Sequence, residues 1–136
     1  LFMNNENSLR GSMEYLKNTI KKDEDHLFVL ESDSGGFSPR GFSFDSSDQI
    51  FKKVENWNQF FKPFLTNNFS VASSGADIKL FKSTGSVLSS LKTDSQKYFE
   101  YHNSAQDIFS KVNKRELELG SAAMSSLVYL VDTFGL

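Results

Sequence analysis

The amino-acid sequence predicts an α/β fold: a partial, mostly parallel sheet flanked by helices, forming a single incomplete domain over residues 1–136. The alternation of two kinds of segment predicts this class. Short apolar runs bounded by turn residues alternate along the chain with segments of helical periodicity. Strands that alternate with helices form βαβ units, which build a parallel sheet. The length corresponds to one domain, and 14 phenylalanines supply ample material for its core.

The first expected elements are a strand end, a helix and a strand. Leu1–Met3 is apolar and is interpreted as the end of a buried strand, so the chain is expected to be a piece of something longer. The helix that follows has Ser8 as its expected N-cap. One face of this helix carries four apolar residues at helical spacing: Leu9, Met13, Leu16 and Ile20. The continuous apolar run His26–Leu30 is typical of a strand buried on both faces.

The middle of the chain is expected to hold a loop and then a helix. Phe37–Phe44 contains Pro39 and Gly41, and it is predicted to be an irregular loop or a short hairpin. Ser47 or Asp48 caps the helix that follows. Pro63 is predicted to end this helix. Its apolar face is predicted to consist of Ile50, Val54, Trp57 and Phe61.

Two strands, a short helix, a loop and a long helix complete the chain. The strands are predicted at Phe69–Ala72 and Val87–Leu91. Between them, the turn Ser73–Asp77 opens a short helix that continues to Phe81 and is ended by Gly85. A loop is predicted at Lys92–Asp107 and the final helix at Lys114–Asp132. The residues of this helix that are predicted to point inward are Leu117, Met124, Leu127 and Val131.

Composition excludes several classes of function. The chain has 15 Lys and Arg against 17 Asp and Glu, a net charge of −2, and no cluster of basic residues, so no nucleic-acid partner is expected. Its longest strongly apolar run near the C-terminus, Leu127–Val131, is too short to span a membrane. The absence of cysteine excludes disulfides, thiolate zinc sites and thiol nucleophiles.

Polar residues suited to chemistry follow the strand predicted at His26–Leu30. Glu31 and Asp33 come directly after it and are followed by Gly35 and Gly36. Open α/β sheets place their ligands at the carboxyl ends of strands, so these carboxylates are candidates for a functional site. The alternative is that they are solvated carboxylates at a strand end. No serine nucleophile elbow, P-loop or dinucleotide fingerprint is present.

Four segments together resemble the C-terminal half of the M28 family of zinc peptidases, the di-zinc aminopeptidases and plasma-glutamate-carboxypeptidase-like enzymes. The first is similar to the family's strand followed by Asn-Glu-Glu-Asn-Gly-Leu-Arg-Gly, and the last is similar to its Tyr-His-His-Ser/Thr-x-x-Asp run. They keep the family's order and rough spacing over essentially the whole chain. The four segments are Leu1–Gly11, Glu31–Phe37, Ser73–Ile78 and Tyr98–Asp107.

The resemblance implies two zinc ions, held in the family by two histidines, two aspartates and a glutamate, with a second glutamate as general base. Glu6 and Asp33 stand at the positions of the glutamate ligand and of one aspartate ligand. The general-base position holds Asn5, and the second histidine position holds Asn103. His102 lies one residue early, and it is a zinc ligand only if its loop can shift. The other two ligands belong to the family's upstream half.

The resemblance therefore implies a fragment of a metallo-exopeptidase that is inactive as it stands. The alternative is a non-catalytic binding or scaffold module that keeps the peptidase fold. Gly75 and Asp77 lie in a turn that flanks the substrate pocket in the family; a serine-rich turn that caps a helix explains the same residues. The implied partners are a peptide substrate and the absent N-terminal half of the domain, and the implied location is secreted or periplasmic. No targeting signal is seen in the chain. A sheet edge left open is expected to favour self-association.

Overall fold

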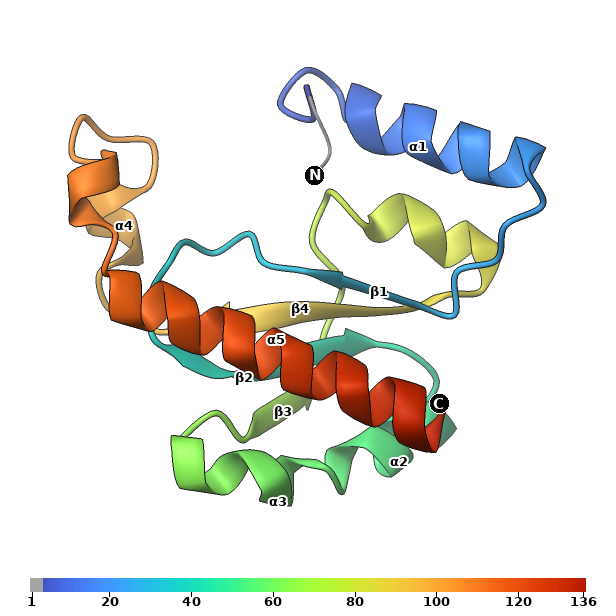
Figure 1. Ribbon diagram of the computed structural model, residues 1–136. Helices are drawn as coiled ribbons and strands as arrows, with labels where there is room; N and C mark the ends of the chain where they lie inside the picture. Colours follow the sequence, from blue (N-terminus) through green and yellow to red (C-terminus); the bar gives the residue numbers. More distant parts are fainter. Residues whose placement is uncertain (1–3) are drawn as a thin grey trace.

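The computed structural model describes residues 4–136 as a four-stranded mixed sheet flanked by helices (Figure 1). The strands are β1 (Phe28–Glu31), β2 (Pro39–Asp45), β3 (Asn68–Val71) and β4 (Val87–Thr93), in the spatial order β1-β4-β2-β3. β1 is parallel to β4 and β2 is parallel to β3, whereas β2 and β4 are antiparallel. The predicted α/β class is confirmed. The strand end predicted at Leu1–Met3 lies outside the described residues.

Strand β2 corrects the prediction of a loop or hairpin at Phe37–Phe44. It is an inner strand of the sheet, and the side chains of Phe42 and Phe44 are fully buried. Pro39 and Gly41 lie at its start, beside an irregularity in its pairing with β4. Gly41 has φ +153°, and a Cβ there would meet the backbone oxygen of Asn68 on β3. Pro39 and Gly41, which suggested a loop, are thus tolerated because the hydrogen-bond pairing of the strands is irregular at this point.

One face of the sheet packs against α2 (Asp48–Glu55), α3 (Asn58–Phe61) and α5 (Lys114–Phe134). The predicted cap of α2 is confirmed, because the Ser47 side chain accepts a hydrogen bond from the backbone N–H of Ile50 at 3.4 Å. The predicted helix is interrupted between α2 and α3, and Pro63 lies in the 3₁₀ turn η1 (Lys62–Phe64). The buried residues of this core are Phe42, Phe44, Val54, Trp57, Phe61, Leu91, Ala123, Leu127 and Leu130.

Helix α5 matches the long helix predicted at Lys114–Asp132, and it extends to Phe134. Leu127 is buried as predicted, and Met124 and Val131 pack against the core as partly buried residues. Leu117, predicted to point inward, is 50% exposed. No helix in residues 4–136 is long and apolar enough to cross a membrane.

The opposite face of the sheet packs against α1 (Arg10–Lys21) and the 3₁₀ helix η2 (Lys79–Thr84). Its core consists of Ile78, Phe81 and Leu88, against which Leu16 and Val29 pack. Gly85 ends η2 with φ +81°, as its place in the sequence predicted.

The apolar face predicted for α1 is only partly buried. Leu16 contacts the core, but Met13 and Ile20 are 55% and 65% exposed, and the buried residues of α1 are Ser12 and Thr19. The predicted N-cap at Ser8 is wrong. Leu9 is the N-cap residue, in the left-handed conformation and without a side-chain cap.

Two short helical segments lie between β4 and α5, the first inside the loop predicted at Lys92–Asp107 and the second just after it. They are α4 (Tyr98–Tyr101) and the 3₁₀ turn η3 (Phe109–Lys111). In Figure 1, α4 stands at the end of the sheet where the loop after β1 begins its course to β2. These segments form one wall of the site described next.

Candidate functional site

A pocket of about 380 Å³ lies beyond the carboxyl end of β1. Its walls come from the segment before α1, the loop after β1, α4 and η3, so segments far apart in the sequence meet there. The residues that line it are Glu6, Asp33, Gly35, Gly36, Phe37, Tyr98, Tyr101, His102, Asn103, Asp107, Ile108, Lys111 and Val112. Glu6, Asp33 and His102, predicted as zinc ligands by resemblance, are therefore brought to one pocket.

The electrostatic environment of this pocket is acidic. Partial burial raises the pKa of the Asp33 carboxyl, and the nearby carboxylates of Asp77 and Glu6 raise it further, while His102 acts in the opposite direction. Carboxylates crowded in this way repel one another unless a cation enters. The pocket thus favours a positively charged group of a ligand.

His102 is held by hydrogen bonds within its own segment. Its Nδ1 lies 3.1 Å from the Tyr98 hydroxyl, and its Nε2 lies 3.0 Å from the Asn103 side-chain nitrogen. The ring also stacks on Tyr98, with the ring centroids 4.8 Å apart. An amide N–H can only donate, so Nε2 is the acceptor, and the lone pair that a metal would need is directed at Asn103.

Asn5, at the general-base position, has a structural contact instead. Its Oδ1 accepts a hydrogen bond from the backbone N–H of Ser12 at 2.8 Å. That N–H belongs to the first turn of α1, where backbone donors have no partner within the helix. Asn5 therefore supplies the cap that Leu9 lacks. Its Nδ2 is buried and has no partner in the described part of the chain.

The zinc site implied by the resemblance does not fit these residues. Within residues 4–136, no three His, Asp or Glu side chains are grouped closely enough to hold a metal ion. Glu6 and Asp33 are two oxygen donors, and Nε2 of His102 is hydrogen-bonded to Asn103 rather than directed at these carboxylates. A stable zinc site needs three or four protein ligands.

A second group of residues is centred on Glu31, the last residue of β1, which does not line the pocket. Glu31 is buried, and its Oε1 accepts hydrogen bonds from the backbone N–H of Gly75, at 2.7 Å, and from the Ser90 hydroxyl. Burial is the main cause that raises the pKa of Glu31, and Asp33 and Asp77 raise it further. Glu31 thus fixes the 73–77 turn to the sheet.

Gly75 and Asp77, predicted to border the substrate pocket, are not among the residues that line it. Gly75 contacts Glu31, and Asp77 acts on the pocket through its charge. Lys111 and the aromatic wall of Phe37, Tyr98 and Tyr101 were not predicted as site residues. Phe37, Tyr98 and Tyr101 lie within the four quoted segments, whereas Lys111 lies outside them.

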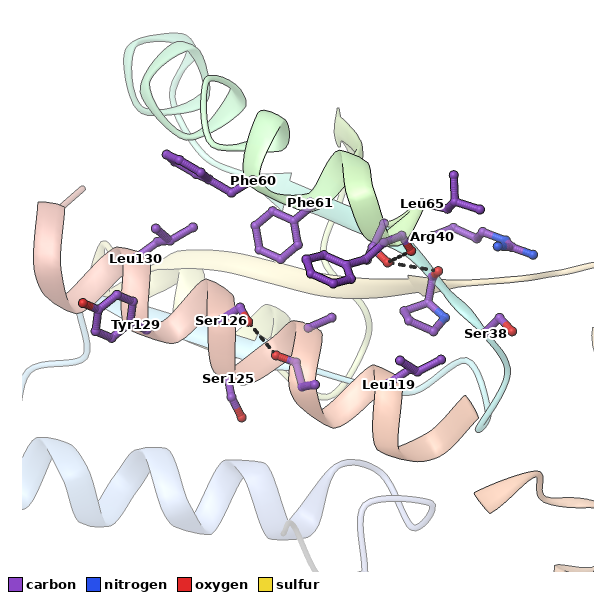
Figure 2. A pocket seen from close by; sticks show the side chains of 15 residues that line it. Ser38, Arg40, Phe60, Phe61, Leu65, Leu119, Ser125, Ser126, Tyr129 and Leu130 are labelled. Carbon is purple, nitrogen blue, oxygen red and sulfur yellow. Dashed lines mark hydrogen bonds between the residues drawn. The ribbon is translucent and has the colours of Figure 1, made fainter. Parts of the chain in front are cut away.

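A larger pocket, of about 670 Å³, lies between η1 and α5 (Figure 2). Figure 2 shows Phe61 and Leu130 among its apolar walls. No Asp, Glu or His lines it, and its cation, Arg40, is paired with Asp94 at 2.7 Å. This pocket lacks groups for hydrolytic chemistry, which leaves the acidic pocket as the candidate site.

The mixed sheet and the helices on its two faces define the chain as an α/β domain with an acidic pocket beyond the end of one strand. The resemblance to the M28 peptidases is confirmed by similarity in structure and in sequence. The crystal structure of a peptidase M28 precursor from Shewanella amazonensis superposes with a TM-score of 0.77 and 25% identity, covering 90% of this chain and 28% of that one.

The sequence is also similar to carboxypeptidase Q of several mammals. The bovine protein is 27% identical over 121 residues, which are 89% of this chain and 26% of that protein. The mouse protein is 30% identical over 109 residues, 78% of this chain and 23% of that protein. The chain thus spans about a quarter of the length of the curated relatives it matches. No family model matches it.

Proposed function

We propose that this chain is a fragment of an M28-type metallo-exopeptidase domain whose own residues no longer support peptide hydrolysis. The position of Asn5 carries this proposal. The resemblance assigns the general base to this position, and here an amide stands there with its oxygen bound to the backbone of Ser12. An amide cannot accept a proton at neutral pH, and a general base is typically worth roughly 10²–10⁴ in rate.

The histidine position supports the same proposal. Asn103 stands where the resemblance expects a zinc ligand, and its side chain occupies the acceptor nitrogen of His102. Glu6 and Asp33 alone are two carboxylates in an acidic pocket. We propose that these two carboxylates are remnants of the family's ligand set. They would require further ligands from outside this chain to bind zinc.

A second candidate function is binding without catalysis. The observation that favours it is that the pocket persists, with a volume of about 380 Å³ and aromatic side chains in its wall. Pockets of this volume accept small ligands. We propose peptide ligands by resemblance to the peptidases, and a secreted or periplasmic location on the same basis.

The experiment that tests the proposal restores the two missing groups. Asn5→Glu and Asn103→His are introduced singly and together into a form of the protein that carries the upstream part of the domain, and dipeptide hydrolysis is measured with zinc added. Activity in the double variant alone supports a decayed active site on a sound scaffold. Hydrolysis by the unaltered protein would refute the proposal.

Asn103→Ala serves as a control for the histidine substitution. It removes the amide from His102 without supplying a new ligand, so it should stay as inactive as the unaltered chain. If the double variant folds, as judged by far-UV circular dichroism, and yet stays inert, the pocket itself has changed and the binding function is favoured.

A further inference from the structure

Asn68 begins a sequence that matches the acceptor pattern for N-linked glycosylation, Asn-x-Ser/Thr with x other than proline. The three residues are Asn68, Phe69 and Ser70, and no other asparagine in the chain has Ser or Thr two positions later. So short a pattern also occurs by chance. Its meaning therefore depends on where the fold places the asparagine.

The structure places this pattern on an outer strand of the sheet. Asn68–Val71 form β3, which comes last in the order β1-β4-β2-β3 (Figure 1). Successive side chains of a strand point to opposite faces, and Phe69 packs against the larger core. Asn68 and Ser70 therefore point to the other face, and Asn68 is exposed to solvent.

The hydrogen bonds of Asn68 leave its amide nitrogen free. Lys92 Nζ on β4 donates to Asn68 Oδ1 at 3.0 Å and to the Ser70 hydroxyl at 3.3 Å. Lys92 can reach both because Gly41, which stands between Lys92 and Asn68 in the sheet, has no side chain. Asn68 Nδ2 has no hydrogen bond among residues 4–136. A sugar bonded to Nδ2 would thus displace none of these contacts, and Oδ1 would still accept from Lys92.

We infer that Asn68 is an acceptor for N-linked glycosylation. The donor in this reaction is an oligosaccharide carried on a lipid diphosphate. The bond between its first sugar carbon and the diphosphate oxygen breaks, and that carbon bonds to Asn68 Nδ2. The lipid diphosphate leaves with the bonding electron pair, Nδ2 releases one proton, and nothing is oxidised or reduced. The inference rests on the secreted location proposed above, because this modification is made on chains that enter the secretory pathway.

The position of Asn68 suits a bulky, hydrophilic group. Asn68 lines neither the acidic pocket nor the larger pocket, so a glycan would leave both of them open. It would also stand beside the edge of β3 that has no neighbouring strand within residues 4–136. A covered edge is less able to pair with a strand of another chain.

The test translates the full chain behind a cleavable signal peptide in the presence of endoplasmic-reticulum microsomes. The fraction protected from added protease has entered the microsomes, and it is analysed by gel electrophoresis with and without peptide-N-glycosidase F. We expect one slower band that returns to the position of the unmodified chain after this treatment. The enzyme converts a glycosylated asparagine to aspartate, so peptide mass spectrometry locates the change at Asn68.

Four variants identify the acceptor and its recognition. Asn68→Gln removes the accepting nitrogen and Ser70→Ala removes the hydroxyl that the pattern requires, so each should abolish the slower band. Ser70→Thr keeps a hydroxyl and should retain it. The matched control is Asn67→Gln, at the neighbouring residue, which is not followed by Ser or Thr at the required position and should leave the slower band unchanged.

Two results would overturn the inference: no slower band in the protected fraction of the unaltered chain, or a slower band that persists in Asn68→Gln. Both are separate from a failure of the proposed function and location, because the added signal peptide supplies entry and no peptidase activity is measured. If the longest natural form, purified from its own cells, carries no glycan while the chain in microsomes does, the proposed secreted location is refuted and Asn68 stands as a competent acceptor.

Discussion

Replacing Gly75 by alanine tests the contact that fixes the 73–77 turn to the end of the sheet. A Cβ at this position would lie 2.0 Å from Glu31 Oε1 and 2.7 Å from Glu31 Cδ. Neither distance is possible between non-bonded atoms, so the Glu31 carboxylate must move. Because Glu31 is only 8% exposed, no solvent-filled space is available to receive it.

The magnitude follows from the loss of one of the two hydrogen bonds that the Glu31 carboxylate accepts. The Glu31 carboxylate accepts from Gly75 N–H and from the Ser90 hydroxyl, and a hydrogen bond to a charged group contributes about 1.5–3 kcal/mol. We expect Gly75→Ala to lower the free energy of unfolding by about 2 kcal/mol, the value for losing one such bond. Urea denaturation followed by far-UV circular dichroism measures this change.

A double-mutant cycle isolates the contact. In a Glu31→Ala background, the three atoms nearest to the new Cβ are gone, so adding Gly75→Ala should cost little. Gly85→Ala is the control: its Cβ would meet no atom within 4 Å, and its φ of +81° alone should cost about 1 kcal/mol. An equal cost for Gly75→Ala in both backgrounds would refute the steric reasoning.

Three further predictions concern stability and association. Asn5→Ala removes the side-chain cap of α1 and should destabilise the chain by about 1 kcal/mol, whereas Asn5→Asp keeps an acceptor and should retain most of that stability in the same denaturation assay. The hydrogen bond from Lys82 lowers the pKa of Asp45 below its ordinary value of 3.8. This pair therefore stabilises the fold above pH 3.8, and its contribution is lost as the pH falls through the lower pKa of the folded state. Asp45→Asn should therefore flatten the acid limb of a stability curve between pH 2 and 5, and an unchanged limb would exclude the pair as its cause. Within residues 4–136, β1 pairs with β4 alone and its other edge has no neighbouring strand, so we expect the isolated chain to be marginally stable or to self-associate. A monodisperse monomer with a sharp two-state transition in sedimentation and unfolding experiments would contradict this.

The alternation of strands and helices was predictable because the patterns that encode it are local. Ser47 caps α2 and Gly85 ends η2 through contacts within a few residues. Strand β2 was missed because its proline and glycine usually break strands, and only its neighbours show that the ladder is irregular there. Periodicity also failed for α1, since part of its apolar face has no partner among the described residues and Met13 stays exposed.

The candidate site was predictable only in part, and for a similar reason. Glu6, Asp33 and His102 were found through motifs, and the structure brings them to one pocket. The cap formed by Asn5 joins residues seven positions apart around a left-handed turn, which no helix-start pattern describes. Lys111 was not predicted to line the pocket because it reaches the pocket through an irregular segment between β4 and α5, where the sequence has no clear period.

Zinc content tests the proposed loss of the active site most directly. It is measured by elemental analysis on the longest natural form of the protein that can be purified, after dialysis against a zinc-containing buffer and then a metal-free one. The substitution at Asn103, together with the hydrogen bond between His102 and Asn103, predicts close to zero zinc ions per chain. A content near two zinc ions per chain would show that His102 or a ligand from outside this chain completes the site, and it would contradict the loss of function proposed here.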